Sequence, residues 1–133
     1  MGSGGPYEDV VGYSRVVAVG DLAWTAGCTS IVDGAVVGNA DAFVQTVTAL
    51  GTALESLERA GFSRTDVVHC RLYVVDVAAH ADQVGRAHAQ VLGEVRPAAT
   101  MLGVSALIDP RLLVEVELVA ARIPAGPAGQ VSR

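Results

Sequence analysis

Two long segments of the sequence alternate strictly between two kinds of side chain, and this pattern constrains the fold more than any other feature. From Val68 to Val74 every even position is apolar, whereas the odd positions include His69 and Arg71. Even positions 112–120 are likewise apolar, and the odd ones include Glu115 and Glu117. Successive side chains of a strand point to opposite faces. The sequence therefore predicts strands over 67–75 and 112–122, each with one purely apolar face.

A third segment has the spacing of an amphipathic helix. Between Ala42 and Ala60 the large apolar residues recur three or four positions apart: Phe43, Val47, Leu50, Leu54 and Leu57. Asn39 or Asp41 can cap the start of this helix, and Gly61 can end it. A second helix is predicted over 79–92.

Shorter strands are expected over 14–19, 22–30, 31–37 and 100–107, and Asp33-Gly34 is a strong hairpin signal. The resulting order β, β, β, α, β, α, β, β predicts an α/β (α+β) fold, one mixed sheet with two helices on one face. At 133 residues the chain is about one domain. We expect this domain to span residues 7–124, with 1–6 as a flexible leader and 125–133 as a flexible tail.

Two helices cover only one face of such a sheet, so the mixed faces need a second layer. The composition also favours a second layer, because the chain has more apolar surface than one small domain easily buries: 51% of residues are hydrophobic and only 17% charged, with a mean hydropathy of +0.44. No apolar run approaches the ~18 residues of a membrane span, and no signal peptide is recognisable. We therefore expect a cytoplasmic protein without membrane contact, whose open sheet face packs on another copy of the chain.

The charged residues exclude several kinds of chemistry. The net charge is -5, and all nine basic residues are Arg. Without lysine, the chain has no Schiff-base nucleophile, no pyridoxal-phosphate anchor and no Walker A loop. An acidic chain with scattered arginines is also a poor partner for nucleic acid. The two cysteines, Cys28 and Cys70, lack metal-ligand spacing, so neither a metal nor a cofactor is expected.

The polar groups on the mixed strand faces are the candidate chemistry. If the two long strands are neighbours, Glu115 and Glu117 lie near Arg71, where a carboxylate and a guanidinium can bind a small substrate and position water. An interface salt bridge without chemistry is the alternative. Cys28 is predicted to be a buried, inert thiol, because its sequence neighbours include no His or Arg. No histidine is predicted to be a catalytic base.

Several motifs resemble those of the RidA/YjgF family. Residues Arg96–Val119, RPAATMLGVSALIDPRLLVEVELV, resemble its C-terminal signature, in which a Pro-Ala pair and a V-x-x-L stretch precede a V-E-I-E strand. Gly12-Tyr13-Ser14-Arg15 is similar to its G-P-Y-S-Q opening, Thr25-Ala26-Gly27-Cys28 to its T-S-G-Q, and Asp66–Asp76 to its D-V-V-K strand. The resemblance covers residues 12–122. It implies a chorismate-mutase-like fold and a homotrimer with ligand clefts between subunits.

The resemblance also implies an activity. Archetypal members hydrolyse reactive imines and enamines, using a Glu to orient water, an Arg to hold the substrate carboxylate and a Tyr in the cleft. The Glu corresponds to Glu115 and the Tyr to Tyr13, but Ala99 stands where the Arg belongs. Arg71 is the candidate replacement, and Arg96, which precedes Pro97 outside the strand, is the weaker one. The remaining cleft positions correspond to Gly27, Cys28, Gly85 and Met101.

The sequence thus predicts a divergent RidA-like hydrolase that acts on a small C=N compound at the intersubunit clefts of a trimer. A non-catalytic module that binds a small ligand or a partner on the same trimeric fold is the alternative. Endoribonuclease activity, reported for some relatives of this family, fits poorly with the acidic charge balance and the absence of lysine.

Overall fold

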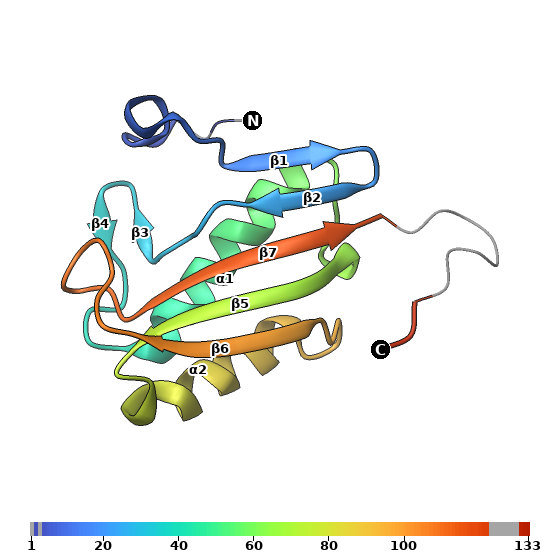
Figure 1. Ribbon diagram of the computed structural model, residues 1–133. Coiled ribbons are helices and arrows are strands. Elements are labelled where there is room, and N and C mark those ends of the chain that lie inside the picture. The colour runs from blue at the N-terminus through green and yellow to red at the C-terminus, as the bar shows by residue number, and fades with distance from the viewer. Residues whose placement is uncertain (1, 3, 123–130) are drawn as a thin grey trace.

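The fold is built around one five-stranded sheet covered by two helices (Figure 1). The computed structural model describes residues 2, 4–122 and 131–133. In spatial order the strands are β1 (Val16–Val19), β2 (Leu22–Thr25), β7 (Val114–Ala121), β5 (Val67–Val75) and β6 (Ala98–Val104). All neighbours are antiparallel except β5 and β6, which are parallel and joined through helix α2 (Val77–Leu92). The predicted mixed α+β architecture is confirmed.

Helix α1 (Ala42–Arg59) matches its prediction closely. Of the two proposed caps the structure uses Asp41, whose Oδ1 accepts a hydrogen bond of 2.9 Å from the Val44 backbone N–H. The helix ends before Gly61, which has a φ of 89° that favours glycine. Both helices lie on the same face of the sheet in Figure 1. They bury the even-numbered residues of the long strands, such as Leu72 and Val116, which are at most 2% exposed.

The predicted hairpin is present, but the strand before it is shorter than expected. Strands β3 (Ile31–Val32) and β4 (Ala35–Val36) pair around Asp33 and Gly34, which have φ values of 51° and 79°. They form a two-stranded sheet of their own and do not join the single mixed sheet that was expected. The expected strand over 22–30 ends at Thr25, and beyond it only Cys28 forms an isolated bridge, with Val116.

A bulge explains this correction. Trp24 pairs with Val119, but the next bridge joins Cys28 to Val116, so the β2 side carries one extra residue. The Thr25 hydroxyl fills the gap by accepting a hydrogen bond of 3.0 Å from the Leu118 N–H. Alternation of side chains does not reveal such an insertion.

Other boundaries differ by a few residues. The strand expected over 100–107 runs from Ala98 to Val104, and the final strand is Val114–Ala121 rather than 112–122. A π-helical turn at Glu8–Gly12 and a 3-10 turn at Arg64–Asp66 were not predicted. Of the expected tail, residues 125–130 lie outside the described residues, and Arg133 donates hydrogen bonds of 3.0 Å to the carbonyls of Thr65 and Val67.

No element of the described chain covers the second face of the sheet. Apolar side chains stay exposed there, with Val17 at 50%, Val19 at 63%, Leu22 at 44%, Trp24 at 42% and Leu102 at 37%. Within the described ranges, no helix is long and apolar enough to cross a membrane.

Gln45 of α1 holds two loops beside the start of β7. Its side chain is fully buried, and its Nε2 donates to the carbonyls of Gly38 (3.1 Å) and Arg111 (3.0 Å). Its Oε1 accepts a hydrogen bond of 2.7 Å from the Leu113 N–H. Both N–H groups of the Gln45 amide and its carbonyl oxygen are therefore hydrogen-bonded to the backbone.

Replacing this amide by an apolar group of similar size should be costly. We expect Gln45→Leu to lower the free energy of unfolding by about 3 kcal/mol, because three buried backbone groups lose their partner. Chemical denaturation of the wild type and the variant measures this difference. A loss below about 1 kcal/mol would show that water or backbone shifts satisfy these groups.

Candidate functional site

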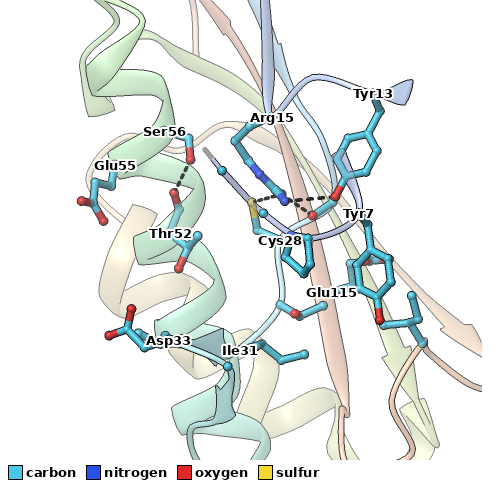
Figure 2. A pocket seen from close by; sticks show the side chains of 18 of the residues that line it. Tyr7, Tyr13, Arg15, Cys28, Ile31, Asp33, Thr52, Glu55, Ser56 and Glu115 are labelled. Carbon is cyan, nitrogen blue, oxygen red and sulfur yellow. Dashed lines mark hydrogen bonds between the residues drawn. The ribbon is translucent and has the colours of Figure 1, made fainter. Parts of the chain in front are cut away.

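A cavity of about 570 Å³ lies between α1, the N-terminal segment and the loop that follows β2 (Figure 2). Thr52 and Ser56 of α1 form one wall. The opposite wall carries Tyr13, Arg15 and Glu115. Four of the predicted site residues line this cavity together: Tyr13, Gly27, Cys28 and Glu115.

Arg15, just before β1, is the central cation of this wall. Its Nη1 donates to the carbonyl of Gly27 at 2.7 Å and contacts the Cys28 Sγ at 3.4 Å. Its Nη2 lies 3.4 Å from the Tyr13 hydroxyl, and its Nε lies 3.7 Å from Oε1 of Glu8. The Arg15 side chain is only 16% exposed, and these contacts fix the guanidinium in place (Figure 2).

Glu115, on β7, is held against the backbone of Gly27. A Cβ at position 27 would lie 2.8 Å from both the carboxyl carbon and Oε1 of Glu115, so only glycine leaves room for this carboxylate. Among the described residues, none donates a hydrogen bond to it. Burial raises the pKa of Glu115, Glu117 raises it further, and the nearby Arg15 opposes both effects.

Cys28 stands next to these groups but does not have the character of a nucleophile. Its side chain is buried, and burial raises its pKa although Arg15 acts in the opposite direction. The fold thus brings an arginine to Cys28 that sequence proximity did not reveal. The thiol form prevails near neutral pH, and nucleophilic catalysis by a thiolate is not favoured.

Arg71 belongs to a different group of side chains. β5 and β7 are neighbours as expected, but the register places Arg71 opposite Glu117 and Tyr73 opposite Glu115. Arg71 Nη1 and the Tyr73 hydroxyl donate to Glu117 Oε1 at 3.0 Å and 2.7 Å. These three residues form a polar cluster on the uncovered sheet face, and Arg71 does not line the cavity.

Two further candidates also lie away from the cavity of the single chain. Met101 of β6 packs against the hydrophobic core, and Gly85 lies on α2. Neither they nor any of the three histidines are among the residues that line the cavity.

Several residues of the site were not predicted from the sequence. Arg15 follows Tyr13 by two positions, the spacing that places side chains on one face of an extended chain, so this signal was available. Asp33 and Tyr7 also line the cavity, but no pattern links the hairpin turn or the N-terminal segment to β7. Only the folded chain brings them together.

The arrangement combines an unpaired, half-buried carboxylate with a phenol and a fixed guanidinium. A carboxylate whose pKa is raised toward neutrality is suited to accept and return a proton. The groups present here can therefore support general acid-base chemistry on a small molecule.

Comparison with known proteins gives consistent matches across most of the chain. The sequence pattern of the family described as "Endoribonuclease L-PSP" matches residues 7–122. The uncharacterized protein SCO2049 of Streptomyces coelicolor is 38% identical over 120 residues, which are 90% of this chain and 89% of that protein.

Solved structures give the same result. The crystal structure of Rv2704 from Mycobacterium tuberculosis, described as a member of the YjgF/YER057c/UK114 family, has a TM-score of 0.83 and 41% identity over 92% of this chain and 97% of that one. YyfA from Yersinia pestis, described as a protein of unknown function of the conserved Rid family, has a TM-score of 0.75 and 26% identity over 83% and 87% of the two chains. The fold, the motifs and these matches together show that the chain belongs to the YjgF/RidA family.

Proposed function

We propose that this protein hydrolyses a small imine or enamine in the cavity, with Glu115 as the group that activates water. The observation that carries the proposal is the position of the Glu115 carboxylate, which faces the cavity against Gly27 and accepts no hydrogen bond from any described residue. An unpaired, half-buried carboxylate is destabilising in itself, so a role in binding or catalysis is a physical reason for its presence.

The reaction follows from this placement. Glu115 accepts a proton from water as the water oxygen attacks the carbon of the C=N bond. Glu115 returns this proton to the nitrogen, which gives a carbinolamine. Glu115 then takes the hydroxyl proton and passes it to the nitrogen as the C–N bond breaks, so the products are a carbonyl compound and ammonia. Tyr13 lines the same wall and can hydrogen-bond to the reacting groups. An enamine enters this sequence after protonation at carbon.

Ribonuclease activity, which the family description names, is less well supported by the cavity. Glu115, Asp33 and Glu55 are acidic groups among its lining, and a phosphodiester would meet their repulsion. The chain as a whole also carries a net charge of -5.

We also propose that the protein is a homotrimer and that a neighbouring copy completes the cleft. The exposed apolar side chains of β1 and β2, such as Val17 and Trp24, favour a second protein layer on the open sheet face. In such an assembly, Arg71, Gly85 and Met101 can face a ligand from another subunit although they do not line the cavity of their own chain.

The first test replaces Glu115 by its uncharged isostere. Glu115→Gln should reduce kcat for imine hydrolysis by roughly 10²-fold or more, because the proton acceptor is lost. It should also raise Tm at neutral pH: the folded-state pKa is raised, so the charged form costs stability once pH exceeds the unfolded pKa. The difference in Tm should disappear in acid, where Glu115 is protonated in both states.

Glu117→Gln is the matched control on the same strand face. This change weakens the contacts of Arg71 and Tyr73, so it should lower Tm. It also removes a charge that raises the pKa of Glu115, so imine hydrolysis should fall, but far less than in Glu115→Gln, because the proton acceptor itself stays. If both variants lose stability and neither loses activity, Glu115 is an interface residue and the non-catalytic ligand-binding module becomes the better account.

A second test moves Glu115 without changing it. Gly27→Ala places a methyl group on the Glu115 carboxylate, whose flexible side chain can swing away at little cost in stability. The backbone of Gly27 is not in the left-handed region, so alanine introduces no strain there. We expect kcat/KM to fall about tenfold or more through lost positioning, with Tm nearly unchanged. Full activity in this variant would contradict the role of the observed carboxylate position.

The third test addresses assembly. Trp24→Glu places a charge on the open sheet face and should convert a trimer into a folded monomer, as seen by sedimentation velocity and circular dichroism. A wild-type protein that is already a stable monomer at micromolar concentration would rule out the proposed trimer.

A further inference from the structure

The cations that line the cavity are already neutralised by the chain itself. Arg15 lies beside Glu8 at 3.7 Å and also donates to the carbonyl of Gly27. Arg59, at the outer end of α1, forms a 2.7 Å ion pair with Glu55. These two arginines are the basic residues among the cavity lining, so among the described residues no cation is left unpaired for a ligand carboxylate.

Two carboxylates of the same cavity have no such partner. Glu115 accepts no hydrogen bond and forms no ion pair with any residue of the described chain, and the same is true of Asp33 in the hairpin turn. Glu115 comes from β7 and Asp33 from the turn of the β3–β4 hairpin, so the two carboxylates reach the cavity from different elements (Figure 2). The unpaired charged groups that line the cavity are therefore both carboxylates, and a bound ligand meets negative charge.

Two aromatic rings line the same space. Tyr7 and Tyr13 are 53% and 37% exposed, so part of each ring remains accessible to a ligand. Aromatic faces attract ammonium and iminium groups through their quadrupole. Carboxylates together with accessible tyrosine rings are the side chains that typically bind an organic cation.

Arg71, the arginine predicted to replace the missing carboxylate-binding residue, does not change this balance. Arg71 is paired with Glu117 in the cluster on the open sheet face. Among the described residues, the lining therefore holds no free cation for a substrate carboxylate, and its unpaired carboxylates would repel one.

We propose that the ligand of this cavity is a small organic cation, namely a protonated imine or the related amine without an α-carboxylate. This inference deepens the proposed function and rests on it for the catalytic step. Protonation suits the chemistry, because an iminium carbon is more electrophilic than that of a neutral imine. In the balanced reaction R₂C=NH₂⁺ and H₂O give R₂C=O and NH₄⁺, and Glu115 carries the two protons of the water from oxygen to nitrogen, one after the other.

A matched pair of stable ligands tests the charge preference directly. Pyrrolidine is a cation at pH 7, and L-proline has the same ring with an added carboxylate. By titration calorimetry we expect pyrrolidine to bind at least tenfold more tightly than proline, with an affinity that weakens as salt is added. Equal or tighter binding of proline would overturn the inference.

Variants show whether the binding uses the named carboxylates. Asp33→Asn and Glu115→Gln should each weaken pyrrolidine binding by fivefold or more. Asp82→Asn is the control, since it removes the same charge from an exposed site on α2 that pairs with Arg86. If all three variants behave alike, the ligand senses only the net charge and the proposed contacts are wrong.

Turnover separates this inference from the proposed function. Two imines with the same side chain can be generated in situ, a 2-imino acid from an amino-acid oxidase and its counterpart without carboxylate from a flavin-dependent amine oxidase. The account predicts a kcat/KM at least tenfold higher for the second. Preference for the 2-imino acid would leave the hydrolase intact and overturn the cation preference. Binding of pyrrolidine without hydrolysis of either imine would support the cation preference and overturn the proposed hydrolase.

Discussion

The guanidinium of Arg15 holds the candidate site together. It connects the N-terminal segment through Glu8, the loop after β2 through the carbonyl of Gly27, and the cavity wall through Cys28 and Tyr13. Backbone hydrogen bonds join the same segments: the Ala26 N–H donates to the Arg15 carbonyl at 2.8 Å, and Cys28 and Val116 exchange two hydrogen bonds. Since the guanidinium is only 16% exposed, its contacts are poorly screened by water. The charge of Arg15 is therefore used in contacts within the protein and is not left for a ligand.

The bulge between β2 and β7 explains the close contact between Gly27 and Glu115. One extra residue shifts the bridge from the regular register to Cys28 and Val116, which brings the backbone of Gly27 against the carboxylate. The side chain of Thr25 compensates for the ladder hydrogen bond that is lost there. A local irregularity in an otherwise regular sheet thus creates the close contact on which the proposed chemistry depends.

Most of the framework could be predicted from the sequence because it rests on periodicity. The strict alternation of Val67–Val75 gives the bounds of β5, and the helical spacing after Asp41 gives α1. The site depends on contacts that periodicity does not encode. The cavity is formed by Arg15, Asp33 and Thr52, which lie far apart in the chain, and the register of β5 and β7 assigns Arg71 to Glu117. The family resemblance correctly placed four residues in one cavity: Tyr13, Gly27, Cys28 and Glu115.

Titration of Glu115 shows most directly whether this carboxylate is unpaired in the free protein and binds a cationic ligand. The carboxyl carbon of Glu115 can be followed by NMR across pH, with Glu115→Gln to assign the signal. The account predicts a pKa above the usual range of glutamate in the free protein, which falls when pyrrolidine binds because a cation stabilises the charged form. An ordinary or lowered pKa in the free protein, or one that pyrrolidine leaves unchanged, would contradict the account.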